Sequence, residues 1–488
     1  MVKADDISLF PMLAAPGKIR VWLGLCCEQP PQTPQWLLNE QLVVPQVQRA
    51  LTPLRPGQHT VYSGIFEFDA PHVVNREACR LRVCMDGKSW QMLETRPLPA
   101  SVAAAPFGEL NILLVSCYDQ SQDASGRIID VLRSRGLRPD LTLLMGDQVY
   151  LDIPTLKNFP EDSAALLRIF ESNYWKGWSC FRQPQTRTGS AYGRVLAMAP
   201  WAAVPDDHEF WNNAPHRSPV VQNSWTEAGR KAWKTAALAC LKAFQWPQRH
   251  PDGRAFTPGD ALVFDIPPLS FFLADTRSQR SAFTGAGSRT LSDTAWEQFE
   301  QWRRDLKKNN HYGVLLSGQP LLDEAAGFIE GRVADFTLPN YGDWPRWSQA
   351  LEELAEDGMH ILLTGDVHYG RVSDVSDRRR QSRAFLEVIA SPMSLVQSVG
   401  VDTWARLNPF RDRLWPRHGQ PRPAPELSGA NKRLQSRLCY GQKGDHVALL
   451  RFRHQAGRLD VTVEHHPLHP DHPGMAASRR SFSLRPSA

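Results

Sequence analysis

The stretch of residues 141–152, LTLLMGDQVYLD, constrains the fold most, because an apolar run ends abruptly in oxygen-bearing side chains. Leu141–Met145 is short and apolar, which predicts a buried strand. The run breaks at Gly146, and Asp147 and Tyr150 follow in what we expect to be a loop. The ends of strands in α/β proteins are where ligands and catalytic groups gather.

Three further apolar runs end in side chains of the metal-ligand type. They are residues 112–115, followed by SCYD; residues 196–204, followed by PDDHE; and residues 361–363, followed by TGDVH. A parallel sheet brings the carboxyl ends of its strands to one edge, so we expect these four ends to lie together. The pattern predicts an α/β fold with a metal centre at that edge.

Five motifs carry a resemblance to a known family. They are, in order, SC at 116–117, GDQVYLD at 146–152, DDHEFWNN at 206–213, LADTR at 273–277 and GDVH at 365–368. Their order resembles that of the PhoD-type alkaline phosphatases, which belong to the calcineurin-like metallophosphoesterase superfamily. The resemblance implies a four-layer α/β/β/α metallophosphoesterase domain. It also implies hydrolysis of phosphate mono- or diesters by attack of a metal-bound hydroxide.

The first hundred residues read differently from the rest of the 488-residue chain. Residues 19–25 and 61–68 alternate with a period of two, which is typical of half-buried strands. Residues 97–106, PLPASVAAAP, have the composition of a linker. We therefore expect a small β-sandwich-like domain over residues 1–100, as many PhoD-type proteins carry, and the metallophosphatase domain over residues 107–488.

The resemblance implies a first metal site around Asp147. Phosphate-ester hydrolysis by two metal ions, about 3.5–4 Å apart, requires a bridging carboxylate, and Asp147 resembles that ligand. Cys117, Tyr150 and His368 resemble the other ligands, and a phenolate suits a trivalent ion such as Fe(III). Asp119 remains an alternative ligand, because it stands where other superfamily members have a histidine.

The second site implied by the resemblance is rich in oxygen. Asp207 and Asp366 stand where relatives have neutral ligands, and Asn213 offers a carbonyl oxygen. This donor set suits Ca²⁺, although spacing alone does not separate calcium from Mg²⁺ or Mn²⁺. The isolated histidine of the superfamily is replaced by SGQP at 317–320, which leaves the full ligand set open.

Catalytic roles follow from the same motifs. His208 resembles the histidine that contacts the phosphate or protonates the leaving group, and Arg277 resembles a phosphate-binding arginine. Glu209 is expected to orient a ligand, and Asp152 either supports the site or caps a helix. The residues expected to support the site or touch substrate are Asp152, Asp206, Glu209, Asn212 and Gln319.

Three other functions are alternatives. A cysteine-nucleophile phosphatase needs C-x₅-R, but the sixth residue after Cys117 is Asp123, which disfavours it. A phosphodiesterase acting on nucleotides or phospholipid headgroups stays open, and so does an inactive metal-binding scaffold. The histidine-rich tail is expected to be solvated rather than metal-binding; its histidines are His465, His466, His469 and His472.

Composition limits partners and location. The net charge of +5 fits an anionic substrate but indicates no particular one. The resemblance implies a small phosphate ester as the partner, with nucleic acid possible only as a substrate. No apolar run is long enough to span a membrane, and no obligate protein partner is indicated. The first residues, MVKADDIS, lack a secretory signal, so we expect a cytoplasmic protein, although PhoD-type relatives are often exported.

Overall fold

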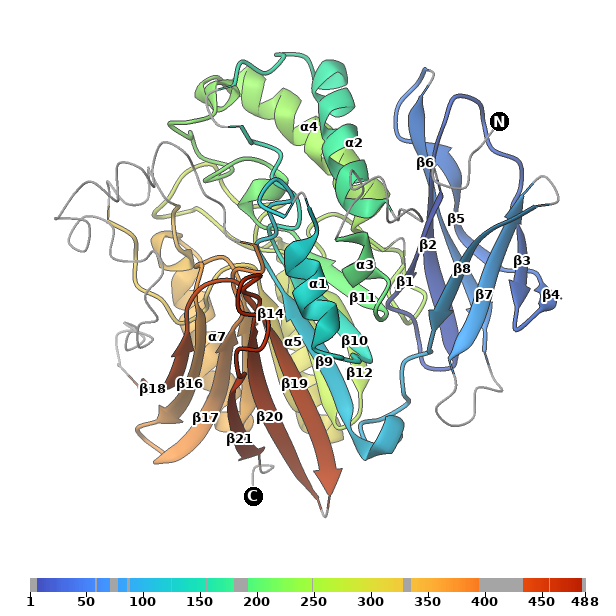
Figure 1. Ribbon diagram of the computed structural model, residues 1–488. Coiled ribbons are helices and arrows are strands. Elements are labelled where there is room, and N and C mark those ends of the chain that lie inside the picture. The colour runs from blue at the N-terminus through green and yellow to red at the C-terminus, as the bar shows by residue number, and fades with distance from the viewer. Residues whose placement is uncertain are drawn as a thin grey trace.

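The structure of the protein is a computed structural model that describes most of the chain. It covers residues 7–57, 59–70, 78–85, 88–123, 125–154, 157–179, 192–247, 249–327, 335–394, 433–455 and 457–484. These residues form a mixed α/β fold with three β-sheets (Figure 1). Within them, no helix is both long enough and apolar enough to cross a membrane.

The largest sheet has ten strands in the order β21-β20-β19-β9-β10-β11-β1-β2-β6-β5. At its centre β9, β10 and β11 run parallel, and β19 pairs antiparallel with β9. Its strands are β1 (Ile7–Met12), β2 (Lys18–Cys27), β5 (Gln46–Pro53), β6 (Thr60–Asp69), β9 (Leu110–Val115), β10 (Leu141–Met145), β11 (Trp201–Val204), β19 (His446–Gln455), β20 (Arg458–Pro467) and β21 (Ser478–Leu484).

The second sheet has seven strands in the order β12-β13-β14-β15-β17-β16-β18. Four of them, β13, β14, β15 and β17, are parallel to one another. Its strands are β12 (Leu262–Ile266), β13 (Leu269–Ala274), β14 (Tyr312–Ser317), β15 (His360–Thr364), β16 (Gly370–Asp377), β17 (Ser382–Ile389) and β18 (Leu434–Gln442).

Side chains of these two sheets share one hydrophobic core. From β10, Leu141, Leu143 and Met145 enter this core, whereas Leu144 belongs to a second core on the helical side. The strand is therefore buried on both faces, which explains why its sequence is apolar except for Thr142. Side chains that can bind a ligand or a metal therefore stand in the loop after such a strand.

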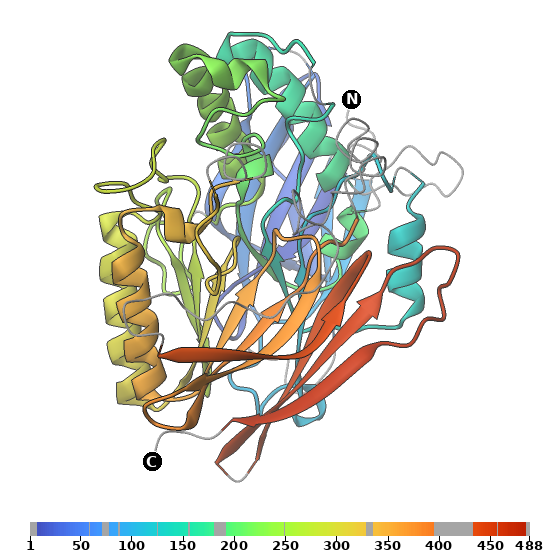
Figure 2. The ribbon, with the colours of Figure 1, turned by 90° about the vertical axis from the view of Figure 1, so that its left-hand side faces the viewer.

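Helices cover the outer faces of the two sheets. The core that contains Leu144 also takes side chains from α1 (Arg127–Ser134), α2 (Ser163–Trp178), α3 (Gly193–Leu196) and α4 (Glu227–Phe244). On the seven-stranded sheet, α5 (Asp293–Asn309) and α7 (Trp344–Asp357) lie side by side (Figure 2). Ser292 caps the N-terminus of α5, because its hydroxyl accepts the Ala295 N–H at 3.0 Å.

The N-terminal strands form two sheets around a core of their own. The third sheet has the order β4-β3-β7-β8, and Trp36 and Leu81 from it pack with Phe66 of β6. However, β1 pairs in parallel with β11, so the N-terminal strands continue the ten-stranded sheet. The predicted division of the chain into a domain over residues 1–100 and a domain over residues 107–488 therefore stays a prediction. The strands of the third sheet are β3 (Gln35–Leu38), β4 (Gln41–Val43), β7 (Cys79–Met85) and β8 (Lys88–Thr95).

Two details of the predicted strand pattern are wrong. The four motif-bearing ends do not belong to one sheet: β9, β10 and β11 lie in the ten-stranded sheet, and β15 lies in the seven-stranded one. The apolar run 196–204 is not one strand, because Gly193–Leu196 is helical and only Trp201–Val204 is extended. Strands buried on both faces look alike in sequence, whichever sheet they join.

Candidate metal centre

The motif-bearing loops meet where the end of β15 contacts the ends of β9 and β10. A Cβ atom placed on Gly365, just after β15, would lie 2.2 Å from Ser116 Oγ and 2.6 Å from the Met145 carbonyl oxygen. Only glycine permits this contact between the end of β15 and the ends of β9 and β10. The loops that follow these strands therefore share one site, although the strands come from different sheets.

Three overlapping groups of possible metal-binding side chains occupy this site. Within each group, one donor atom from each residue lies within 4.8 Å of the others. The groups share residues, since Asp147 and Asp207 each belong to two of them. The groups are Cys117–Asp147–His368, Asp147–Asp207–His208 and Asp206–Asp207–Asp366.

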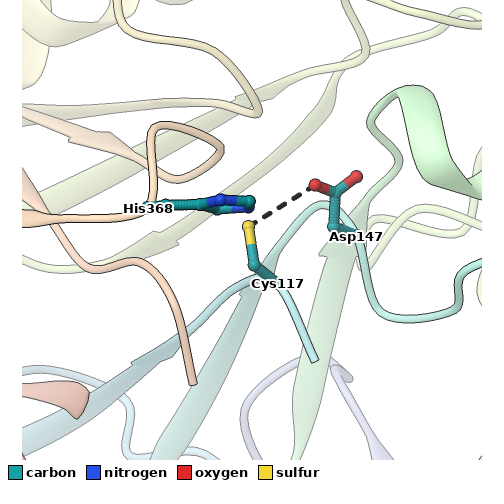
Figure 3. Close-up of side chains that lie close together, drawn as sticks. All are labelled: Cys117, Asp147 and His368. Carbon is teal, nitrogen blue, oxygen red and sulfur yellow. Dashed lines mark hydrogen bonds between the residues drawn. The ribbon is translucent and has the colours of Figure 1, made fainter. Parts of the chain in front are cut away.

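The first group contains Cys117, whose sulfur lies between the His368 ring and the Asp147 carboxylate (Figure 3). Cys117 Sγ is 3.4 Å from Asp147 Oδ2 and 3.1 Å from the hydroxyl oxygens of both Ser116 and Ser391. Burial and the nearby Asp366 carboxylate raise the pKa of the Cys117 thiol to about 12. A cation would be needed to hold this thiol deprotonated at neutral pH.

Glu209 holds the backbone around Asp147. Its carboxylate accepts N–H groups from Asp147 at 2.9 Å, from Gln148 at 2.6 Å and from Asp206 at 2.8 Å. Burial raises the pKa of Glu209 to about 7, and the N–H donors oppose this shift. Glu209 thus fixes the turns that carry Asp147 and Asp206, while belonging to none of the three donor groups.

Tyr150 is buried beside the first group. Its hydroxyl has no hydrogen-bond partner among the described residues, and its ring centroid lies 4.2 Å from that of His208. Burial, together with the charges of Cys117 and Asp147, raises the pKa of Tyr150 well above its usual value. A buried hydroxyl without a partner costs about 1–3 kcal/mol, and a bound cation would remove that cost.

The second predicted site is the group around Asp207 and Asp366. The Asn213 backbone N–H donates to Asp207 Oδ2 at 2.6 Å, which places Asn213 beside this group. Gln319 lies on its other side, with Nε2 3.4 Å from Asp366 Oδ2. Asp206 is fully buried, and its Oδ2 has no hydrogen-bond partner in the described part of the chain. Asp206 therefore offers a carboxylate oxygen without a partner beside Gly318 of the SGQP stretch.

His208 is held by Asp152. Its Nδ1 lies 2.9 Å from Asp152 Oδ1, and Asp152 also accepts the Asn212 N–H at 2.8 Å. Burial alone would lower the pKa of His208, but the carboxylates of Asp152, Asp207 and Asp147 outweigh it and raise the pKa well above the usual value. Asp152 acts here as the partner of His208 and caps no helix in the described residues.

Arg277 does not face solvent. Its side chain is 0 % exposed, and its donors contact Asp206, Asp335 and the carbonyl oxygen of Ala214. These carboxylates keep the pKa of Arg277 well above its usual value, although burial opposes them. In this conformation Arg277 holds Asp206 and Asp335, so contact with a phosphate would require it to exchange a partner.

Several predicted ligands have a left-handed backbone, which is uncommon outside glycine. Such conformations cost about 1–3 kcal/mol each and concentrate at functional sites, where the surrounding structure enforces them. The φ angles are 54° for Cys117, 58° for Asp147, 68° for Asn213, 63° for Asp366 and 54° for His368.

Other residues of the site were missed or misplaced. Asp335 follows no apolar run, so no pattern in the sequence indicated it. Ser391 does follow one, directly after β17, and the strand-end rule could have found it. Asp119 accepts the backbone N–H and hydroxyl of Ser121 at 2.8 Å each, and it belongs to none of the three donor groups.

The expectation of a solvated histidine tail is wrong for two of its members. His465 is 0 % exposed and His466 is 8 % exposed, because both belong to β20 inside the ten-stranded sheet. His469 and His472 lie beyond that strand and are exposed, as expected.

Comparisons with known proteins add little to this geometry. No protein-family model matches the sequence, and no curated protein matches it either. GAP50, described as the anchor in the inner membrane complex of Plasmodium, aligns over 78% of this chain and 90% of its own, with 8% identity and a TM-score of 0.34. TT1561 of Thermus thermophilus aligns over 58% of this chain and 90% of its own, with 12% identity and a TM-score of 0.24. Similarity this low supports no argument about function.

Proposed function

We propose that the protein is a metal-dependent phosphoesterase of the PhoD-like type, built on a four-layer α/β/β/α domain. The observation that supports this proposal is the chain of overlapping donor groups, in which Asp147 and Asp207 are each shared by two groups. Shared carboxylates are what a site for two neighbouring cations requires.

The donor chemistry suggests which cation each group would hold. Cys117, Asp147, His368 and Tyr150 suit Fe(III), because a thiolate and a phenolate both donate negative charge. The oxygen-rich group around Asp207 and Asp366 suits Ca²⁺, or else Mg²⁺ or Mn²⁺. When bound, such cations lower the pKa of water and neutralise charge on the phosphoryl oxygens.

The protein's own side chains would supply the remaining chemistry. His208 is the candidate general acid, because Asp152 holds its Nδ1 and leaves Nε2 to give a proton to the leaving oxygen. In the proposed reaction, water-derived oxygen attacks phosphorus in line as the ester P–O bond breaks, and that proton neutralises the departing alcohol. The configuration at phosphorus should therefore invert in a chiral thiophosphate ester.

The test combines metal analysis with turnover. The purified protein should contain iron with a visible absorption band from its thiolate or phenolate, and also calcium, magnesium or manganese. It should hydrolyse p-nitrophenyl phosphate, bis-p-nitrophenyl phosphate or both; activity on the diester alone would indicate a phosphodiesterase. Metal uptake without turnover on either ester would identify an inactive scaffold, and failure to take up any metal would overturn the proposal.

A further inference from the structure

Two buried histidines lie beneath the candidate metal centre. His446 at the start of β19 is 1 % exposed and His465 in β20 is 0 % exposed. Their ring centroids are 5.1 Å apart. Neither residue belongs to a donor group of the centre, so their burial calls for another explanation.

Both residues bind one short stretch of backbone, residues 389–394, which we call the Ser391 segment. His465 Nε2 lies 2.8 Å from the Ile389 carbonyl oxygen at the start of the segment. The backbone N–H of His446 donates to the Pro392 carbonyl oxygen at 2.8 Å. The segment is thus held at two points from the side of β19 and β20.

The hydrogen bonds of His465 define its tautomer. Tyr440 OH lies 3.0 Å from His465 Nδ1, and the Ile389 carbonyl can only accept, so Nε2 carries the proton. Burial lowers the pKa of His465 to about 3, which keeps the ring neutral. A neutral ring with both nitrogens engaged has a fixed orientation and makes a rigid support.

The other side of the Ser391 segment touches the metal centre. Ser391 Oγ lies 3.1 Å from Cys117 Sγ and accepts the His368 backbone N–H at 3.2 Å. Two further N–H groups of the segment bind the end of β9: that of Met393 donates to the Ser116 carbonyl at 2.9 Å, and that of Ser394 donates to the Cys117 carbonyl at 3.1 Å. One six-residue segment therefore joins both sheets at the first donor group.

The histidine rings also contact the strand that follows His368. A Cβ atom on Gly370 would lie 2.6 Å from His446 Nε2 and 2.9 Å from His465 Cδ2. Only glycine leaves room for both rings at this point. The histidine pair therefore contacts the Ser391 segment on one side and the backbone beyond His368 on the other.

We propose that His465 is a positioning residue for the Cys117–Asp147–His368 group. Its hydrogen bond fixes Ile389, and through the Ser391 segment it sets the placement of Cys117 and His368. The inference that this placement serves metal binding rests on the proposed function. The effect of His465 on the placement of Cys117 does not depend on the proposed function, because it can be measured in metal-free protein.

The experiment compares His465→Leu with His465→Gln and with the control His360→Leu. Glutamine can restore a donor to the Ile389 carbonyl, whereas leucine cannot. His360 is also buried, at 3 % exposed, and its Nδ1 accepts the Gly313 N–H at 2.9 Å at the far end of the seven-stranded sheet. The two leucine variants thus each remove a buried histidine ring, near to and far from the centre: His465→Leu loses two hydrogen bonds and His360→Leu loses one.

The first readout is the rate at which iodoacetamide alkylates Cys117 in metal-free protein, followed by peptide mass spectrometry. We expect His465→Leu to raise this rate at least ~10-fold over wild type, His465→Gln to restore most of the protection, and His360→Leu to change it less than ~2-fold. Equal rates in the two leucine variants, at matched thermal stability, would overturn the proposal.

The second readout is iron affinity and the absorption band, where loss of a supporting contact typically costs ~10–100-fold in metal affinity. If wild-type protein takes up no metal, the proposed function fails, while the alkylation result still decides the positioning role. Should His465→Leu not fold, Tyr440→Phe removes the hydroxyl that orients the ring. It should raise the alkylation rate in the same direction by a smaller factor, and no change there would contradict the proposal.

Discussion

The acid-rich centre and the Arg20–Glu67 pair are two different ways to bury carboxylates. Arg20 on β2 and Glu67 on β6 are direct cross-strand partners, 3 % and 5 % exposed, and Arg20 Nε donates to Glu67 Oε2 at 2.9 Å. Lys18 adds a second cation 3.1 Å from Glu67. In this region, the fold supplies the positive charge that the buried carboxylate needs.

The centre has less compensation of this kind: Arg277 reaches Asp207 only at 4.0 Å, and the other neighbouring group that can carry positive charge is His208, whose pKa is raised. Asp147, Asp207 and Asp366 lie close together, and the buried arginine nearest to them, Arg277, is shared with Asp206 and Asp335. Burial is the main cause that raises the pKa of Asp147 and Asp366 well above the usual value, and the neighbouring negative charges add to it. Buried carboxylates with a built-in cation indicate a structural role, whereas those without one indicate a site that recruits a cation.

The largest expected effect comes from Asp147→Asn, which removes the carboxylate shared by two donor groups. Changes to residues that only support metal ligands typically cost ~10–100-fold in metal affinity or activity. For a ligand we therefore expect more than ~100-fold loss of turnover on the p-nitrophenyl esters and a matching loss of bound metal. The metal-free variant should nevertheless melt at a higher temperature than metal-free wild type, because one repelling charge is gone. Undiminished turnover in this variant would remove Asp147 from the active site.

The opposite behaviour is expected for Arg20→Leu. Leaving Glu67 buried without its main partner should cost ~3 kcal/mol of unfolding free energy, the lower end of the usual range, because Lys18 remains in contact. Guanidinium unfolding would measure the loss, and metal content per folded protein should not change. Arg20→Lys, which keeps the charge, should recover part of the stability. A loss of bound metal in Arg20→Leu would contradict a purely structural role for the Arg20–Glu67 pair.

The pH dependence of stability should differ between metal-free and metal-loaded protein. Burial raises the pKa of Asp206 to about 6 and of Glu209 to about 7, so the folded state binds these protons more tightly than the unfolded state. Their stabilising contribution is complete below pH ~4 and is lost as the pH rises through 6 and 7. Buried histidines outside the centre, unlike His208, act in the opposite sense: burial lowers the pKa of His446 to about 4, so its contribution is lost as the pH falls.

Histidines outside the centre, such as His446, contribute equally to the stability of the metal-free and the metal-loaded protein, so their contributions cancel in the difference. The gain in unfolding free energy on metal loading should therefore grow from pH 5 to pH 7, by about 1.4 kcal/mol per pH unit for each proton displaced. Denaturant unfolding with chelator and with added metal at both pH values would measure it. A gain that stays constant with pH would mean that cation binding does not displace the protons of these two acids.

The sequence was sufficient to predict the site residues that stand directly after apolar strands. Cys117, Asp147, Asp207 and Asp366 could be grouped in this way, because a strand buried on both faces leaves polar side chains only at its ends. It was not sufficient to find Asp335, the partner of Arg277, which lies 58 residues away from it in sequence. Such partners depend on which loops meet in three dimensions, and no local pattern records this.

The burial of the histidines in the C-terminal strands could not be predicted for the same reason, because their partners are distant in sequence. The composition around His465 is typical of a solvated tail, yet Tyr440 and the Ile389 carbonyl bind its two nitrogens from distant parts of the chain. Likewise, the pairing of β1 with β11 joins residues far apart in sequence and could not be predicted from periodicity. Long-range pairing is therefore what the sequence alone left undetermined.

The smallest expected effect separates the two remaining candidates for the first site, Asp119 and Tyr150. Asparagine at position 119 can still accept the Ser121 N–H through Oδ1, so Asp119→Asn should change iron affinity less than ~2-fold and stability by ~1 kcal/mol or less. Tyr150→Phe removes a buried hydroxyl without a partner among the described residues. It should stabilise the metal-free protein by ~1 kcal/mol while weakening iron binding and shifting the absorption band. If Asp119→Asn loses the iron and Tyr150→Phe keeps it, the carboxylate is the ligand, and the buried phenol is only part of the wall around it.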